Sequence, residues 1–216
     1  MRRILVHERP EARITPVIPV VVLSAGMSTR MGQPKALLPV SDTDTFLTRI
    51  VRTFLEAGVD DVVVVLGHEA PRVAARLAAT GLPARVVVNE QYESGQFSSV
   101  LAGLNAVDRP GVRALLLTLV DVPLLNAATV RAVVERYRAT GAPIVRPVRG
   151  LEHGHPVLID RSLFAQLRSA DRSQGAKPIV RGHVSPAGDV EVDDAGSFLD
   201  IDTPDEYARA IGRPLL

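Results

Sequence analysis

The chain has 216 residues with 25 basic and 24 acidic side chains, so its formal net charge is +1. That balance argues against a nucleic-acid-binding domain, which usually carries a strong basic excess. The absence of cysteine excludes disulfides, thiolate nucleophiles and zinc-thiolate sites.

Residues 1–16 lack periodicity and contain Pro10 and Pro16, which predicts a tail or an added edge element. Residues 17–216 are long enough to bury one core, so a single domain is expected there. No apolar run approaches the roughly 20 residues that span a bilayer, and the first residues do not resemble a secretory signal. We therefore expect a soluble, cytoplasmic protein with no membrane partner.

Five apolar, β-branched runs come next, at residues 17–23, 61–66, 84–88, 112–120 and 143–148. Between them, as at residues 46–55, apolar side chains recur every three or four positions, which is typical of helices. Strands that alternate with helices predict right-handed crossovers and a mainly parallel sheet covered on both faces. The expected fold is a three-layer α/β/α sandwich with a Rossmann-like sheet.

The later part of the chain predicts a helix over residues 126–140 that ends at Gly141, and a last helix that begins at Thr203 with Pro204 in its first turn. Short apolar stretches at residues 156–159, 189–192 and 198–201 alternate with turns. These stretches suit edge strands and a substrate-facing subdomain better than a second core. Residues 189–206 contain eight acids and no base, whereas residues 1–40 contain six bases and two acids.

The segment LSAGMSTRMGQPKALLP, at residues 23–39, follows the first predicted strand. Gly26 and Gly32 let the backbone approach an anion, and main-chain N–H groups in such a turn form an anion-binding nest. Arg30 adds a bidentate fork and Lys35 adds a point charge, a pairing that suits a polyphosphate. Ligands of open parallel sheets bind at the carboxyl ends of the strands, where this loop lies. The segment matches neither the dinucleotide fingerprint nor the P-loop.

Lys35 is also one of only two lysines in the chain, against 23 arginines, and the other is Lys177. A lysine retained in such a composition is a candidate for a role that needs an ammonium group. A coding bias towards arginine that leaves two lysines at random positions is the alternative.

The whole segment resembles the signature of the molybdenum cofactor nucleotidyltransferases, which belong to the Rossmann-like NTP transferases. The family pattern is L-x-x-G-x-S-x-R-M-G-x-x-K-x-L-L, and residues 23–38 meet every fixed position. Further blocks at residues 89–104, 116–125, 153–160, 175–180 and 198–207 resemble later family segments, and the first of these resembles the segment that lines the nucleoside pocket in the family. The likeness covers about residues 17–210, and it implies a nucleotide-diphospho-sugar transferase type of fold and a Mg²⁺-dependent nucleotidyltransferase.

The resemblance implies that Lys35 contacts the α-phosphate of a nucleoside triphosphate and that Arg30 binds the leaving phosphates. It also implies that Asp121 and Asp202 hold Mg²⁺. A lone carboxylate after an apolar strand independently favours a metal partner for Asp121, with a structural aspartate that caps the next turn as the alternative. The family usually has glycine where Val120 stands. The other implied nucleotide contacts are Leu23, Ser24, Ala25, Gly26, Ser28, Gly32, Gly95, Ser98 and Ser99.

On the acceptor side the resemblance implies contacts from His155, Asp200 and Lys177. His153 and His155 are two residues apart, which on a strand places both on one face, but without further ligands they make a poor zinc site. Lys177 is expected near a helix start that would favour an anion. The alternatives are a structural His155, an exposed surface Lys177, and a helix-capping role for Asp200 or Asp202.

The implied reaction transfers a nucleoside monophosphate to the phosphate of molybdopterin and releases pyrophosphate, with no covalent nucleophile. Pro34 before Lys35 is typical of the cytidylyl branch, whereas the guanylyl branch has aspartate there, so CTP is favoured. Three alternatives remain open. They are guanylyl transfer to the same cofactor, nucleotidyl transfer to another phosphorylated acceptor, and a noncatalytic carrier that hands the cofactor to a client molybdoenzyme.

Overall fold

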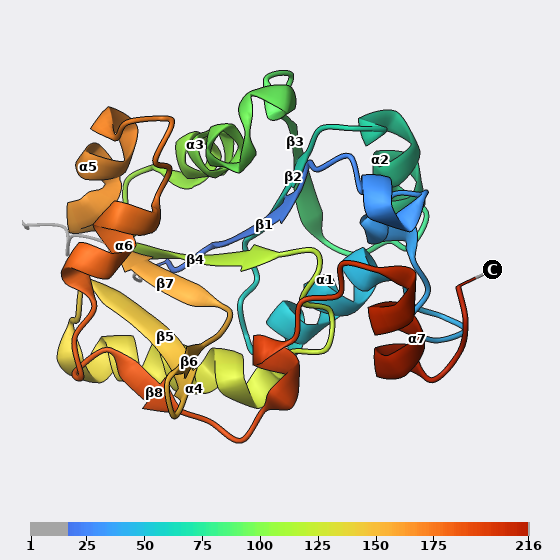
Figure 1. The fold of residues 1–216 in the computed structure, drawn as a ribbon. Coiled ribbons are helices and arrows are strands. Elements are labelled where there is room, and N and C mark those ends of the chain that lie inside the picture. Colours follow the sequence, from blue (N-terminus) through green and yellow to red (C-terminus); the bar gives the residue numbers. More distant parts are fainter. Residues whose placement is uncertain (1–16, 216) are drawn as a thin grey trace, which may run out of the picture.

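An eight-stranded sheet forms the centre of the computed structural model, which describes residues 17–215 (Figure 1). The tail or edge element predicted for residues 1–16 lies outside the described residues. The strand order is β3 (Ala84–Val88), β2 (Val62–Leu66), β1 (Val20–Ser24), β4 (Ala114–Leu119), β7 (Val157–Asp160), β5 (Ile144–Arg149) and β6 (Glu152–His153). The eighth strand, β8 (Asp189–Glu191), pairs with β5.

Most of the sheet is parallel, as predicted. The strands β1, β2, β3 and β4 pair in parallel with one another. The strand β7 runs antiparallel between β4 and β5. The carboxyl ends of β1 and β4 therefore lie side by side at one edge, and the loops that follow them meet there.

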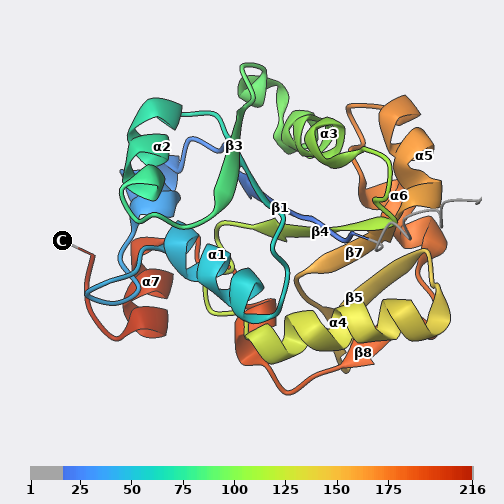
Figure 2. The same cartoon turned by 180° about the vertical axis from the view of Figure 1, so that it is seen from behind.

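Helices cover both faces of the sheet, which confirms the predicted three layers. On one face α1 (Phe46–Glu56), α2 (Ala70–Ala78) and α4 (Ala127–Thr140) share one apolar cluster with alternate residues of β1, such as Val20 and Val22. On the other face α3 (Gln96–Val107), α5 (Phe164–Ser169) and α6 (Lys177–His183) share a second cluster with Val21 and Leu23. The two views from front and back show α3 and α5 on one side of the sheet and α4 on the opposite side (Figures 1 and 2).

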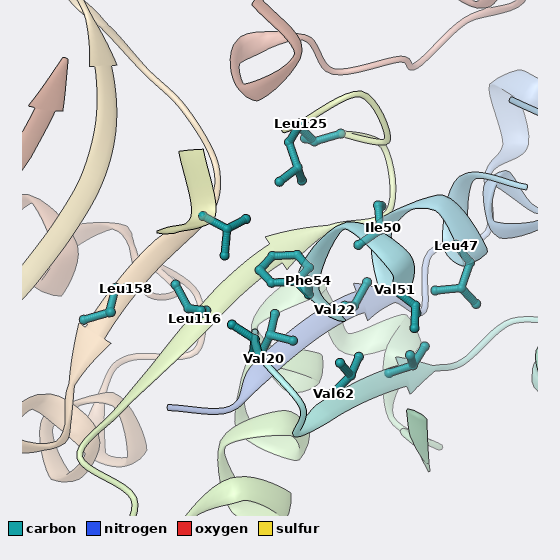
Figure 3. Close-up of a cluster of buried hydrophobic side chains, with 14 of the residues drawn as sticks. Val20, Val22, Leu47, Ile50, Val51, Phe54, Val62, Leu116, Leu125 and Leu158 are labelled. Atoms are coloured by element: carbon teal, nitrogen blue, oxygen red, sulfur yellow. The ribbon is translucent and has the colours of Figure 1, made fainter. Parts of the chain in front are cut away.

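The helix α1 illustrates how local signals and packing agree. Its N-terminus is capped by Thr45, whose hydroxyl accepts a hydrogen bond from Thr48 N while the Thr48 hydroxyl accepts one from Thr45 N. Its apolar side chains recur at helical spacing, and Ile50, Val51 and Phe54 are fully buried. Figure 3 shows these side chains pointing towards those of β1, β2 and β4.

Several predicted boundaries are confirmed. All five predicted strands are present, and α4 ends at Gly141, whose φ of 62° lies in the left-handed region that glycine adopts without strain. The last helix, α7 (Pro204–Ile211), follows Thr203, whose side chain and that of Glu206 form a reciprocal cap. Thr203, and not Asp200 or Asp202, is therefore the capping residue of α7.

Two predictions for the C-terminal third are wrong. The stretch at residues 156–159 is not an edge strand, because β7 pairs on both sides, with β4 and with β5. The stretch at residues 198–201 is not a strand at all. A short 3₁₀ helix, Ala195–Phe198, precedes it, and the Asp194 side chain fixes that turn by accepting a hydrogen bond from Gly196 N. The prediction for residues 189–192 is confirmed, since β8 lies beside β5 only.

Among residues 17–215, no helix combines the length and the apolar composition that a membrane-spanning segment requires.

Candidate active site

A cavity of about 300 Å³ opens at the carboxyl ends of β1 and β4. Four parts of the chain form its walls: the loop after β1, the segment after β2, the beginning of α3, and the loop after β4 together with Asp202. The residues that line it are Leu23, Ser24, Ala25, Gly26, Ser28, Thr29, Arg30, Pro34, Lys35, Ala36, His68, Val73, Tyr92, Gln96, Ser99, Leu119, Val120, Asp121 and Asp202. We call it the nucleotide cavity.

The loop after β1 has a defined backbone shape. Ser28 and Gly32 both adopt left-handed conformations, with φ of 53° and 68°, on either side of a short 3₁₀ helix, Thr29–Met31. The Ser28 hydroxyl accepts a hydrogen bond from Lys35 N at 3.1 Å. The Met31 side chain is buried in a third apolar cluster with Tyr207 of α7. These contacts hold the loop as a curved wall of the cavity.

Two cations and two carboxylates meet on one side of this cavity. Lys35 Nζ lies 3.2 Å from Asp121 Oδ2 and also donates to Asp202 Oδ1. The Arg30 guanidinium lies 2.7 Å from Asp202 Oδ2. The Lys35 side chain is only 10% exposed, so its charge is largely removed from water. The hydrogen bond from Lys35, followed by that from Arg30, holds the pKa of Asp202 below its ordinary value.

The fold brings the two carboxylates together from distant parts of the chain. Asp121 follows β4, and its backbone carbonyl accepts a hydrogen bond from Ile201 N at 2.8 Å. Asp202 comes next in the chain, and Glu206 accepts hydrogen bonds from the backbone N–H groups of Asp202 and Thr203 at 2.8 and 2.9 Å. The beginning of α7 is thus fixed against the loop after β4.

The Asp121 carboxylate has one oxygen without a partner. Oδ1 is buried and forms no hydrogen bond with any described residue. A buried carboxylate oxygen left unpaired is costly, and a hard cation would satisfy it. Among residues 17–215, no three candidate metal ligands of the His, Cys, Asp and Glu types gather in one place. Two carboxylates with remaining positions for water and phosphate oxygens fit the way proteins hold Mg²⁺.

A second, larger cavity of about 760 Å³ adjoins the first. Leu23, Gln96 and Leu119 line both cavities, so the two meet beside the carboxyl ends of β1 and β4. The outer walls of the second cavity come from the turn after β6, from α3 and from α6 with the turn before it. We call it the acceptor-side cavity, because His155 and Lys177, the acceptor contacts that the family resemblance implies, line it.

Comparison with known proteins identifies the family of this chain. A sequence model of the family described as "MobA-like NTP transferase domain" matches residues 20–187. The chain belongs to the MobA-like NTP transferase domain family. The matched range includes the loop after β1, Asp121 and most of both cavities, whereas Asp202 and α7 lie beyond it.

Similar proteins differ in their names. A protein of Paenarthrobacter nicotinovorans named nicotine blue oxidoreductase is 33% identical over 91% of this chain and 97% of its own length. The molybdenum cofactor cytidylyltransferase of Escherichia coli is 28% identical over 88% of this chain and 93% of its own. The crystal structure of Rv0371c from Mycobacterium tuberculosis is 33% identical, with a TM-score of 0.75, and covers 92% of this chain and 98% of its own. A further crystal structure of Rv0371c is a complex with manganese.

Within this MobA-like domain, the sequence-predicted nucleotide contacts divide into two groups. Eight of them line the nucleotide cavity: Leu23, Ser24, Ala25, Gly26, Ser28, Arg30, Lys35 and Ser99. Gly32 shapes the loop without lining the cavity, and Gly95 lines the acceptor-side cavity. The Ser98 hydroxyl is used within its own loop, where it accepts from Asn89 Nδ2 at 2.8 Å and bonds to the Gly95 carbonyl.

The predicted acceptor-side residues lie at or near the second cavity. Lys177 begins α6, as predicted, and lines this cavity. His153 and His155 also line it, but not as neighbours on one strand, because β6 ends at His153 and His155 lies in the turn before β7. Asp200 is not among the residues that line either cavity. Its negative charge favours the protonated form of His155.

The surroundings lower the pKa of His155 and raise the pKa of Asp200. Desolvation lowers the pKa of His155, although the Leu117 carbonyl, 3.4 Å from Nδ1, and the nearby carboxylates act in the opposite direction. Desolvation and then the like charge of Asp121 raise the pKa of Asp200, against the opposing charge of His155. Near neutral pH, His155 is therefore a neutral side chain in the wall of the acceptor-side cavity.

His68, Tyr92 and Gln96 are among the residues that line the nucleotide cavity but were not individually predicted as contacts. The ring centroids of His68 and Tyr92 lie 6.2 Å apart. The glycine at position 67, directly before His68, could have indicated that two parts of the chain approach closely at this place. A Cβ there would lie 2.6 Å from Tyr92 Cβ and 2.7 Å from the Ala25 carbonyl, so only glycine permits this close approach.

Proposed function

We propose that this MobA-like NTP transferase is a cytidylyltransferase that transfers CMP from CTP to the phosphate of molybdopterin. The observation that carries the proposal is the cluster of Arg30, Lys35, Asp121 and Asp202 in the wall of the nucleotide cavity. Phosphoryl-type transfer depends on positioning and charge neutralisation, and this cluster supplies groups of both signs for it. The choice of CTP rests on Pro34, which lines the cavity directly before Lys35.

In the proposed reaction, an oxygen of the acceptor phosphate forms a bond to the α-phosphorus of the nucleotide. The bond between the α-phosphorus and the oxygen that bridges to the β-phosphate breaks, and pyrophosphate leaves with that electron pair. The acceptor phosphate is already ionised, so no side chain needs to remove a proton from it. Lys35 neutralises the α-phosphate, and Arg30 with the backbone of residues 25–32 holds the departing phosphates.

The charges of the cluster indicate that a divalent cation would be needed to bind the triphosphate. Lys35 and Arg30 are cancelled by Asp121 and Asp202 when nothing else is bound, so the cluster by itself offers little net attraction to a triphosphate. A divalent cation held by the two aspartates would neutralise phosphate charge and release both cations for the nucleotide. Magnesium is the proposed ion, and the manganese complex of Rv0371c supports a divalent cation in this fold.

The test is pyrophosphate release with molybdopterin and each of the four nucleoside triphosphates in the presence of Mg²⁺. We expect CTP to be the preferred substrate, and we expect Lys35→Ala and Asp121→Asn to abolish turnover while the thermal unfolding midpoint stays close to that of the wild type. Asp193→Asn is the matched control, because Asp193 is exposed and lines neither cavity. Retained turnover in Lys35→Ala would refute the mechanism.

The other results of this assay have defined meanings. Preference for GTP would favour guanylyl transfer, and turnover with methylerythritol phosphate in place of molybdopterin would favour another acceptor. Binding of the pterin cofactor without turnover would favour a carrier that delivers it to a client molybdoenzyme. Each of these results would change the proposed nucleotide, acceptor or activity, whereas the description of the two cavities would stay the same.

A second candidate function is that of an oxidoreductase, because one similar protein is named nicotine blue oxidoreductase. Hydride transfer has no requirement for paired carboxylates beside a lysine, so the cluster favours nucleotidyl transfer. The two functions are separated by following oxidation of a nicotinamide dinucleotide with nicotine blue. Oxidation that persists in Asp121→Asn, together with no pyrophosphate release from any triphosphate, would favour the oxidoreductase.

A further inference from the structure

The acceptor-side cavity is lined by charges of one sign. Its walls include Arg146, Arg172, Lys177 and Arg181, whereas none of the described residues that line it is an aspartate or a glutamate. Its remaining walls are mostly apolar or small. This composition differs from that of the nucleotide cavity, where each cation lies against a carboxylate.

Only one of these four cations is neutralised. The Arg146 guanidinium lies 2.9 Å from Asp189, and its side chain is only 12% exposed, so this pair is a fixed part of the β5 and β8 region. Within the described range 17–215, the other three cations form no ion pair: Arg172, Lys177 and Arg181 are exposed and follow one another on α6 and the turn before it. They therefore place uncompensated positive charge at one end of the cavity.

That end is separate from the place where transfer would occur. The cavities share Leu23, Gln96 and Leu119, and the charged cluster proposed to bind the nucleotide phosphates lines only the nucleotide cavity. The three unpaired cations line only the acceptor-side cavity and contribute nothing to the nucleotide cavity. The other walls of the acceptor-side cavity include the apolar side chains of Phe97 and Val157.

We propose that Arg172, Lys177 and Arg181 bind a second anionic group of the acceptor, distinct from the phosphate that attacks the nucleotide. The acceptor class is thus a molecule with a phosphate at one end, an apolar or ring-shaped body, and another anion at the far end. This inference rests on the proposed transfer to a phosphorylated acceptor. It makes the three cations specificity-determining residues, because an acceptor that lacks the second anion leaves them without a partner.

The test compares α,ω-alkanediol monophosphates with the corresponding bisphosphates over a series of chain lengths. Their affinities are measured by isothermal titration calorimetry on protein saturated with Mg²⁺ and the nonhydrolysable analogue α,β-methylene-CTP, which occupies the nucleotide cavity. At the best chain length we expect the bisphosphate to bind about tenfold more tightly than the monophosphate. We expect the advantage to decrease as salt is raised, since the three cations are exposed.

The decisive variant is the triple substitution R172Q/K177Q/R181Q, with R138Q as the matched control. Arg138 is exposed on α4 and lines neither cavity. The bisphosphate advantage should disappear in the triple variant and persist in R138Q. Equal affinities for the two ligands in the wild type, or an advantage that survives in the triple variant, would overturn the inference.

The same titrations distinguish this inference from the proposed function. Binding of α,β-methylene-CTP is measured first, and it should be unchanged in the triple variant because the three cations do not line the nucleotide cavity. If the analogue does not bind the wild type, the proposed function fails, and the comparison of monophosphate and bisphosphate is then made on protein without nucleotide. Loss of the advantage in the triple variant supports the second anion site in either case.

Discussion

Replacing Asp194 by alanine should destabilise the protein and weaken the site. Asp194 is only 5% exposed, and its carboxylate accepts five hydrogen bonds. These come from Asn126 N (2.9 Å) and Nδ2 (2.8 Å), Thr129 Oγ1 (2.7 Å), Gly196 N (3.1 Å) and Ser197 Oγ (2.8 Å). The residue therefore ties the C-terminal segment before Asp202 to the beginning of α4.

The magnitude follows from the donors that the substitution leaves buried. Each unsatisfied buried donor costs about 1 to 3 kcal/mol, but hydroxyl groups rotate and water enters the space vacated by the carboxylate. We therefore expect a loss of about 3 to 5 kcal/mol for Asp194→Ala, the usual range for breaking a buried charged network. At about 2 to 4 °C per kcal/mol for a domain of this size, the unfolding midpoint should fall by roughly 6 to 20 °C.

Calorimetric unfolding measures this loss, and pyrophosphate release at a temperature where both proteins are folded measures the effect on the site. We expect kcat/KM to fall about tenfold, because Asp202 follows the loosened segment and small displacements of positioned groups are costly. Asp193→Ala is the control, since Asp193 is exposed and a surface substitution usually changes stability by less than about 0.5 kcal/mol. An Asp194→Ala midpoint within about 2 °C of the wild type would refute this reasoning.

Three further predictions concern single contacts. A Cβ at Gly26 would meet no atom within 4 Å and would enter the nucleotide cavity. Gly26→Ala should therefore raise KM for the triphosphate about tenfold and leave the unfolding midpoint unchanged. An unchanged KM would contradict the anion nest. Burial raises the pKa of Asp61, but hydrogen bonds from Arg85 and Arg109 outweigh burial and lower that pKa below its ordinary value. The stability that the ionised Asp61 contributes is therefore complete above about pH 4 and is lost as the pH falls through the folded-state pKa. Urea unfolding should therefore show Asp61→Asn to be less stable than the wild type at pH 7, with the difference shrinking in acid; a constant difference would argue against the lowered pKa. Tyr207→Phe removes a 2.7 Å hydrogen bond to the Pro39 carbonyl and should cost about 1 kcal/mol in the same assay, where an unchanged midpoint would show that the bond contributes nothing.

The parts of the fold that could be predicted depend on signals carried by neighbouring residues. The β-branched runs gave the five main strands, and the Asn126 to Gly141 segment gave α4, because helix ends are marked locally. The position of the loop after β1 and its cations could be predicted because they lie within a few residues of one another, directly after a strand, whereas its 3₁₀ helix and the left-handed backbone of Ser28 were not predicted. Such features require no knowledge of which elements pair.

The remaining features depend on partners that are distant in the chain. An apolar run at residues 156–159 indicates a strand, but nothing in it shows that β7 is inserted between β4 and β5. The prediction that Asp121 and Asp202 lie close together came from the family resemblance. The structure shows the hydrogen bond from Ile201 N to the Asp121 carbonyl that brings the two residues together. His68 was missed because it belongs to no motif, and Tyr92 was not singled out within the block at residues 89–104. Their contact exists only across the loops after β2 and β3.

The contact between Lys35 and Asp202 joins residues that are 167 positions apart. At translation rates of about 5 to 20 residues per second, the ribosome adds Asp202 roughly 8 to 33 s after Lys35. During that interval the nascent chain first contains the cationic loop alone and later also Asp121, but it still lacks the second carboxylate of the cluster. The four-residue cluster is therefore complete only when nearly the whole chain has been synthesised.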